Sequence, residues 1–248
     1  MKVSIITVAY NSEKTIEDTI KSVVSQSYLN IEYILVDGAS TDGTMRIVNK
    51  YSDDITKVIS EKDGGIFDAM NKGISLATAD IVGILNSDDF YIDNQVIEKV
   101  VKKFNENTDA VYADLVYVDA RDTNKIKRTW HSGYYQHGAF VKGWMPPHPT
   151  FFVKNEIYKK FGAYSLKLRS AADYEFMLRV IHKEKIRIEY LPEVIVKMRT
   201  GGESNASLKN RLNANKEDKL AWKMNGLKPG LFTFIRKPIS KIQQFIRR

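Results

Sequence analysis

Two adjacent carboxylates, Asp88 and Asp89, follow an apolar run in the stretch ILNSDDFY at 84–91. Like charges side by side repel each other, so we expect a specific interaction to offset the repulsion between these two carboxylates. In one interpretation, one Asp caps the next helix and its neighbour is solvated. In the other, both bind a hard divalent cation such as Mg²⁺ or Mn²⁺, which prefers oxygen ligands, bridges nucleotide phosphates and stabilises a diphosphate leaving group. Their place at the end of a buried strand favours the metal site.

Other polar residues also stand where predicted strands end. Asn11 follows a β-branched run at 2–10, and Asp37 closes a second run at 31–37. Because parallel sheets bind ligands at the carboxyl ends of their strands, we expect these residues to line one site with the acidic pair. The first strand is followed neither by G-x-G-x-x-G nor by a P-loop, so a nucleotide at this site must be held without a glycine-rich loop.

Strand and helix patterns alternate over the first 118 residues. Apolar runs predict strands over residues 2–10, 31–37, 55–60, 81–85 and 110–118. Apolar residues at helical spacing lie between these runs. The alternation predicts an α/β fold with a mainly parallel sheet and helices on both faces. We expect one domain with two halves, over 1–118 and 119–215, and a tail over 216–248.

The composition limits the classes of protein. The chain has 248 residues, enough to bury a full core, and its 43% hydrophobic and 27% charged residues are typical of a soluble globular protein. It has no cysteine, which excludes disulfides, thiolate metal sites and a cysteine nucleophile. The sequence shows neither a signal peptide nor an apolar run of about 18 residues, so we expect a cytoplasmic protein that does not span a membrane.

All of the excess positive charge lies near the C-terminus. Residues 219–248 contain eight basic and no acidic residues, and the other 30 basic residues equal the 30 acidic ones. Apolar residues recur there at helical spacing, at Leu231, Ile235, Ile239, Ile242 and Ile246. This pattern predicts a membrane-surface anchor, kinked or divided at Pro238. The neutral body and acid-lined site argue against a nucleic-acid partner. The oligomeric state stays open.

Five sequence motifs, taken in their order along the chain, indicate the class of protein more specifically than the composition does. They are SIITVAYN at 4–11, VDGASTDGT at 36–44, EKDGGIFDAMNKGI at 61–74, LNSDDF at 85–90 and SAADYEFMLR at 170–179. Together they resemble the inverting GT-A glycosyltransferases of glycosyltransferase family 2, over roughly residues 1–205. Bacterial enzymes that assemble O-antigen, capsule or exopolysaccharide units are most similar. The resemblance implies the GT-A fold, a Rossmann-like, mainly parallel sheet with helices on both faces. It also implies that 1–118 is a nucleotide-sugar-binding half and 119–215 an acceptor-binding half of the same GT-A domain.

The resemblance implies roles for residues of the donor site. Thr7, Ala9 and Tyr10 would form the wall against which the nucleotide base lies. Asp37 would accept a hydrogen bond from the base, typically uracil, although Asp also serves as an ordinary turn residue. Asp63 would contact the nucleoside or the sugar.

Residues 86–89, NSDD, are called the acidic motif. This motif departs from the family pattern D-x-D-D, because Asn86 replaces the first acid. The resemblance then implies that Asp89 binds Mn²⁺ or Mg²⁺ directly and that Asp88 contacts the ribose or the metal. Arg199 begins the stretch RTGGESN, which we expect to form a lid over the diphosphate, with Arg199 supplying positive charge.

The acceptor half contains the aromatic stretch GWMPPHPTFF at 143–152. Aromatic rings suit the apolar faces of sugars, so Trp144 is a candidate acceptor contact, and packing in the core is an equal alternative. His148, held between prolines, is a candidate for substrate contact or for a structural role.

Asp173 matches the second acid of the Glu-Asp motif, where the family carries its catalytic base, and Ala172 replaces the Glu. An inverting transfer needs one such carboxylate to take the proton of the attacking hydroxyl. The alternative for Asp173 is an acid that favours the helix dipole. Glu175 is the second candidate for the base.

The sequence therefore predicts a metal-dependent hexosyl- or N-acetylhexosaminyltransferase at the inner face of the cell membrane. Its donor would be a UDP-sugar and its acceptor a hydroxyl of a lipid-linked saccharide used for surface polysaccharide. Two alternatives stay open: a sugar-phosphate nucleotidyltransferase, which normally has a glycine-rich loop after the first strand, and a non-catalytic module that binds carbohydrate or membrane.

Overall fold

The computed structural model describes residues 1–201, 208–230 and 233–234. A nine-stranded sheet runs through this described part of the chain. Its strands are β1 Val3–Ala9, β2 Ile31–Asp37, β3 Lys57–Ser60, β4 Ile81–Ile84, β5 Asp89–Tyr91, β6 Ala110–Val118, β7 Ile126–Trp130, β8 Phe152–Lys154 and β9 Ile188–Arg199. The helices are α1 Ile16–Val24, α2 Thr44–Val48, α3 Ile66–Leu76, α4 Val96–Val101, α5 Asn155–Phe161, α6 Ala172–Met177 and α7 Leu208–Met224. Short 3₁₀ turns η1 Asn49–Tyr51, η2 Ala139–Lys142 and η3 His148–Thr150 and a π-helical segment η4 Leu178–Lys183 complete the elements.

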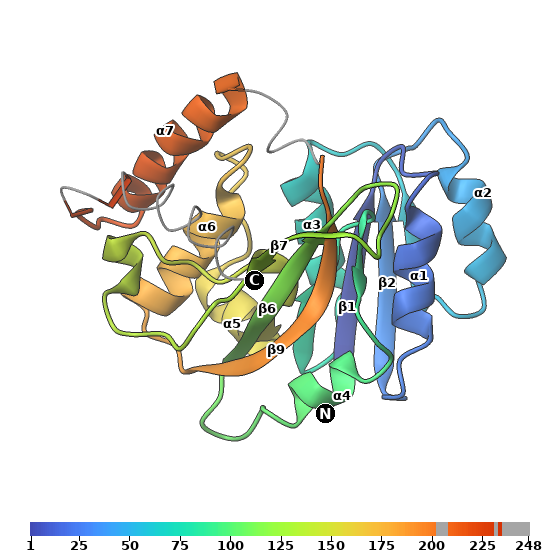
Figure 1. Cartoon of the computed structure of the whole chain (residues 1–248), viewed down its shortest axis with the longest axis horizontal. Coiled ribbons are helices and arrows are strands. Elements are labelled where there is room, and N and C mark those ends of the chain that lie inside the picture. Colours follow the sequence, from blue (N-terminus) through green and yellow to red (C-terminus); the bar gives the residue numbers. More distant parts are fainter. Residues whose placement is uncertain (202–207, 231–232, 235–248) are drawn as a thin grey trace.

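The strand order β3-β2-β1-β4-β8-β6-β9-β5, with β7 paired to β6, makes one mixed sheet. The neighbouring strands among β1 to β4 are parallel, as are β6 and β9, whereas β5, β7 and β8 run antiparallel to their partners. The predicted alternation and mainly parallel sheet are confirmed. The short strands β5, β7 and β8 were not predicted. The sheet continues across the predicted boundary at residue 118, and β6 and β9 lie side by side in it, between β8 and β5 (Figure 1).

Helices cover both faces of the sheet. Alternate residues of β1 point into two cores: Ile5 packs in the core with α1, α2 and α4, and Ile6 packs in the core with α3, α5 and α6. The second core is tight, since a Cβ added at Gly73 of α3 would lie 2.4 Å from Cγ2 of Ile6. The period-two burial of β-branched residues thus explains why the apolar runs of the sequence are continuous.

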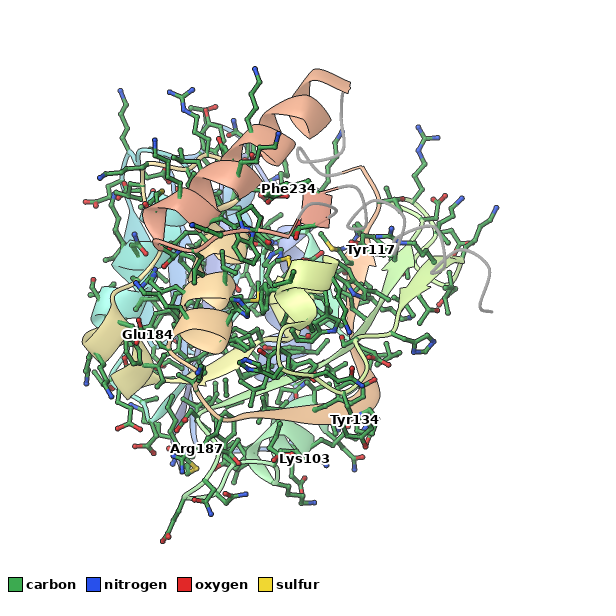
Figure 2. All side chains as sticks on the ribbon, turned by 90° about the vertical axis from the view of Figure 1, so that its left-hand side faces the viewer. Lys103, Tyr117, Tyr134, Glu184, Arg187 and Phe234 are labelled. Atoms are coloured by element: carbon green, nitrogen blue, oxygen red, sulfur yellow. The ribbon has the colours of Figure 1, made fainter. Side chains whose placement is uncertain are left out.

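The carboxyl ends of β1, β2, β4, β6 and β9 share one edge of the sheet, because these strands run in the same direction. Figure 2 shows Tyr117, near the end of β6, toward one end of the molecule and Lys103 and Arg187 at the other. The predicted ligand edge is therefore the end marked by Tyr117.

Helix α7 packs along α6, on the opposite side of the molecule from α2 (Figure 1). Its Trp222 is 1% exposed and donates a 2.8 Å hydrogen bond to the hydroxyl of Tyr174. The boundary predicted at residue 216 thus falls inside a helix that packs on the domain. The apolar stripe predicted from Leu231 onward lies outside the described residues. Among the described residues, no helix is both long and apolar enough to cross a membrane.

Candidate active site

The acidic motif forms a tight connection between two strands. β4 ends at Ile84, and the backbone then turns, with the N–H of Asp89 donating to the carbonyl of Asn86 at 3.1 Å. Asp89 opens the short strand β5 and pairs with Met198 of β9. The hydroxyl of Thr19 in α1 donates to the carbonyl of Asp89 at 2.7 Å. The acids are thus fixed by contacts with β9 and α1 as well as by the strand before them.

Asp89 is 0% exposed, and among the described residues neither of its carboxylate oxygens has a hydrogen-bond partner. Burial, and then the charge of Asp88, hold the pKa of Asp89 well above its usual range. Burial also raises the pKa of the partly exposed Asp88, against the opposing charges of Arg199 and His148. An unpartnered buried carboxylate is costly, and a bound cation would remove that cost.

The described residues contain no group of three or more His, Cys, Asp or Glu side chains that could hold a metal ion. The acidic pair alone still suits Mg²⁺ or Mn²⁺, because such ions are commonly bound by one or two carboxylates, with substrate phosphates and water completing the coordination. The carboxylate oxygens of Asp89, which have no hydrogen-bond partner among the described residues, are suited to bind a cation. Asp88 and Asp89 are the residues that would hold it.

Arg199 lies next to the acidic motif and is 6% exposed. Its guanidinium donates to the backbone carbonyl of Asp88 at 2.7 Å, pairs with Asp18 of α1 and lies 4.7 Å from the centre of the Phe90 ring. The predicted role over the diphosphate is not supported by this geometry, because the guanidinium is already occupied in holding the acidic motif. The following lid residues 202–205 lie outside the described residues.

Asp173 and His148 face each other across the edge of the sheet. Asp173 stands in the first turn of α6, with its side chain 18% exposed and its Oδ2 3.5 Å from Nδ1 of His148. On its other side, Nε2 of His148 lies 3.2 Å from Nδ2 of Asn86. Burial lowers the pKa of His148, although Asp173 and Asp88 oppose this effect. The structure therefore brings the predicted base and the acidic motif together through His148.

Glu175, the second candidate for the base, is 3% exposed and is occupied by other contacts. It accepts hydrogen bonds from Arg179 at 2.9 and 3.1 Å and from the side-chain amide of Asn225 at 3.0 Å. These contacts do not support Glu175 as the base, because its carboxylate is already occupied in joining α6 to neighbouring segments. Its i, i+4 spacing to Arg179 was the sequence signal for this role.

The loop before Asp173 is held from α7. One carboxylate oxygen of Glu217 accepts the backbone N–H groups of Arg169, Ser170 and Ala171 at 3.1, 2.8 and 3.0 Å. Ser170 does not cap α6; its hydroxyl donates to Glu217 at 3.0 Å. Glu217 was missed by sequence reasoning, because no local pattern indicates a partner 46 residues away.

Tyr10, Gly38 and Asp63 meet where β1 and β2 end. Tyr10 is 65% exposed, which excludes a place in the core and leaves its ring available for stacking. A Cβ added at Gly38 would lie 2.5 Å from Oδ2 of Asp63 and 3.4 Å from the ring of Tyr10. Asp63 accepts the backbone N–H of Gly65 at 2.9 Å. These residues form the exposed part of the predicted nucleotide site.

The other predicted nucleotide contacts point inward. Thr7 is fully buried and accepts a hydrogen bond from Tyr33 at 3.2 Å, so a place on the wall of the site is not supported by its burial. Ala9 is 6% exposed. Asp37 is 0% exposed and accepts hydrogen bonds from Ser40 and from the Ser60 hydroxyl. Its turn contacts are thus established, and its contact with a base stays a prediction.

Asn11 and Trp144 also have clear structural partners. Asn11, at a backbone φ of 50°, accepts the N–H of Thr41 at 2.9 Å and so holds the turn after β2. Trp144 donates its ring N–H to the carbonyl of Ser132 at 2.8 Å and packs against Tyr112 and Phe140. The core alternative thus describes Trp144 better than the acceptor contact does.

Comparison with known proteins identifies the family of this chain. The sequence matches the family described as Glycosyl transferase family 2 over residues 4–185. It is 27% identical over 208 residues to the PGL/p-HBAD biosynthesis glycosyltransferase of Mycobacterium tuberculosis H37Ra, covering 82% of this chain and 78% of that protein. It is 30% identical over 179 residues to an uncharacterized glycosyltransferase of Mycobacterium tuberculosis CDC 1551, covering 71% and 68%.

Solved structures share the fold. TarS 1–349 of S. aureus in complex with UDP-GlcNAc matches with a TM-score of 0.68 at 21% identity, over 91% of this chain; the chain spans 65% of that TarS chain. The mannosyltransferase PcManGT of Pyrobaculum calidifontis, in complex with GDP-Man and Mn²⁺, matches with a TM-score of 0.67 at 20% identity, over 99% and 69% of the two chains. These matches confirm the predicted GT-A fold. The family match over most of the chain shows that this protein belongs to glycosyl transferase family 2.

Proposed function

We propose that this glycosyltransferase moves a hexose-type sugar, with inversion, from a nucleotide diphosphate to a hydroxyl of a lipid-linked saccharide in bacterial surface polysaccharide synthesis. The observation that carries the proposal is the buried, unpartnered carboxylate of Asp89 beside Asp88, placed at the same edge as Asp173. A cation and a base at one edge are the two groups that such a transfer requires.

The donor is proposed to be a nucleotide sugar, with UDP as the nucleotide. TarS was solved with UDP-GlcNAc and PcManGT with GDP-Man, which supports a nucleotide-sugar donor for a related fold. The exposed ring of Tyr10 provides a surface on which the base stacks, and the close approach of Gly38 and Asp63 bounds the pocket beside it. Asp63 then contacts the nucleoside or sugar.

The metal is proposed to be Mn²⁺ or Mg²⁺, held by Asp89 and Asp88. When bound, the ion stabilises the charge that develops on the leaving diphosphate. PcManGT was solved with Mn²⁺, which supports this choice. The chain itself contributes the fixed backbone of the acidic motif, because Arg199 holds the carbonyl of Asp88 and β9 holds Asp89.

Asp173 is proposed as the base. It is partly exposed and lies at the start of α6, so an acceptor hydroxyl can reach it. As the hydroxyl oxygen bonds to the anomeric carbon, the bond from that carbon to the diphosphate breaks and the proton passes to the Asp173 carboxylate. The leaving group carries the bonding electrons away as nucleoside diphosphate.

The acceptor is proposed to be lipid-linked because residues 219–248 are basic and without acids, a composition that suits the anionic surface of a membrane. The protein would then be a peripheral protein on the cytoplasmic face. A sugar-phosphate nucleotidyltransferase is not favoured by the family match, and a non-catalytic module stays as an outcome of the test below.

The test is Asp173→Asn, compared with Asp53→Asn at an exposed carboxylate. A thermal-shift screen of nucleotide sugars, with Mn²⁺ or with EDTA, first identifies the donor. We expect Asp173→Asn to retain the metal-dependent shift with that donor and to lose transfer by a factor of about 10²–10⁴. Unchanged turnover would show that another group is the base, and the absence of any donor shift in the wild type would favour a non-catalytic module.

A further inference from the structure

Asn86, His148 and Asp173 come from three separate segments and form one line of side chains. Asn86 follows β4, His148 opens η3 and Asp173 lies in the first turn of α6. The two contacts are 3.2 Å from Asn86 Nδ2 to His148 Nε2 and 3.5 Å from His148 Nδ1 to Asp173 Oδ2. Asn86 lies two residues before Asp88, so this line joins the acidic motif to the base.

The backbone that carries the imidazole is held in place. His148 stands between Pro147 and Pro149, whose rings fix their backbone φ angles. The hydroxyl of the fully buried Thr150, in the same turn, lies 2.9 Å from each of two carbonyl oxygens that can accept its hydrogen, those of Ala113 and Pro147. The ring itself is 23% exposed and lies between Asn86 and Asp173, so its orientation depends on these two side chains.

The partners determine which ring nitrogen carries the proton. The ionised carboxylate of Asp173 only accepts hydrogen bonds, so Nδ1 must carry a hydrogen to interact favourably with it. In a neutral ring Nε2 is then an acceptor, and it faces the Asn86 amide, which donates. Burial favours the neutral ring, as the lowered pKa of His148 indicates. The distance of 3.5 Å to Asp173 is long, as is common for active-site hydrogen bonds before substrate binds.

We propose that His148 is a positioning residue for Asp173, and that the Asn86 amide holds its ring in the tautomer that directs Nδ1–H at the Asp173 carboxylate. This inference rests on the proposed function, in which Asp173 is the base. It gives a reason for the departure from D-x-D-D. A carboxylate at position 86 could only accept, so it would compete for the ring proton that serves Asp173.

The kinetic test compares two variants of His148, each of which keeps a nitrogen at the place of only one of the two ring nitrogens. In His148→Asn the amide nitrogen takes the place of Nδ1 and can still donate to Asp173, whereas in His148→Gln it reaches the place of Nε2 and cannot. We expect His148→Gln to lower kcat by about 10- to 100-fold at unchanged KM for the donor, the range typical of lost orienting partners, and His148→Asn to lose clearly less. His137→Asn, at an exposed histidine, is the control and should keep full activity.

Equal losses in the Asn and Gln variants, or a loss that appears only in KM, would overturn the proposal. Thermal unfolding of each variant separates this comparison from misfolding, because both replace the same partly buried ring. If both variants unfold early, Asn86→Asp provides the same test without altering the ring.

The spectroscopic test does not depend on activity. The chain has four histidines, so ¹⁵N long-range NMR spectra can be assigned with one variant for each. We expect His148 in the wild type to show a protonated Nδ1 and an unprotonated Nε2 near neutral pH, and Asn86→Asp to protonate Nε2. The opposite tautomer in the wild type would refute the inference. A failure of the proposed function would be seen separately, as unchanged turnover in Asp173→Asn.

Discussion

Replacing Asp89 by Asn should stabilise the protein when metal is withheld and abolish its response to metal. The wild-type carboxylate is fully buried, and among the described residues neither of its oxygens has a hydrogen-bond partner. The backbone N–H of Arg199, and then the side-chain amide of Asn86, lie close enough to oppose the rise in the pKa of Asp89, although neither makes a hydrogen bond to its carboxylate. An Asn side chain has nearly the same shape and removes the repulsion with Asp88.

The magnitude follows from the charge, because the Asn amide leaves as many buried polar groups as the carboxylate and removes only its charge. An unsatisfied buried polar group costs about 1–3 kcal/mol, and more when it is charged. For a chain of this size, 1 kcal/mol corresponds to roughly 2–4 °C in Tm. In EDTA we therefore expect Asp89→Asn to raise Tm by several degrees. Asp53→Asn, at an exposed carboxylate, should change Tm by no more than about 2 °C.

Metal and nucleotide together should reverse the order of the two Tm values, that of the wild type and that of Asp89→Asn. A ligand at about 100 times its Kd stabilises the folded state by roughly 2.7 kcal/mol, or about 5–10 °C here. With MnCl₂ and UDP, the wild type should gain this shift and Asp89→Asn should not. The assay is differential scanning fluorimetry with and without each component.

Two results would refute this reasoning. A lower Tm of Asp89→Asn in EDTA would mean that the carboxylate has stabilising partners. A full Mn²⁺-dependent shift in the variant would mean that Asp89 is not a metal ligand, and Asp88→Asn would then be the variant that loses the shift.

Two further predictions concern stability. Burial raises the pKa of Glu32, but hydrogen bonds from Ser4 and Thr78 more than offset this and lower it to about 2. Glu32 therefore stabilises the fold by on the order of 3 kcal/mol above about pH 4.5, and this contribution is lost as the pH falls toward 2. Glu32→Gln should lower the urea midpoint strongly at neutral pH and little near pH 2; an equal loss at both would contradict the assignment. At Gly83, an added Cβ would lie 2.4 Å from the Phe152 ring, so Gly83→Ala should cost about 1–3 kcal/mol in the same assay, whereas an unchanged midpoint would show that the ring can move.

The sequence was sufficient where the determinants are local. The β-branched run at 31–37 became β2 over the same residues, because burial on both faces of a parallel sheet favours such runs. β5 and β8 have only three residues each and are fixed by pairing with strands far along the chain, so no local pattern marks them.

The same distinction applies to the site. The acidic pair could be found because it follows a predicted strand, and Asp173 could be placed from its motif. The contacts of Arg199 could not be predicted, because spacing along β9 does not reveal that Asp18 of α1 would pair with its guanidinium. The line from Asn86 through His148 depends on three segments meeting, which only the folded chain shows.

The carboxylate of Glu217 makes α7 part of the environment of the proposed base. Three successive backbone N–H groups ahead of Asp173 donate to this one side chain. The same helix places Trp222 against Tyr174, the residue that follows Asp173 in α6. A displacement of α7 would therefore reach Asp173 along two routes, through the loop before it and through the helix that carries it.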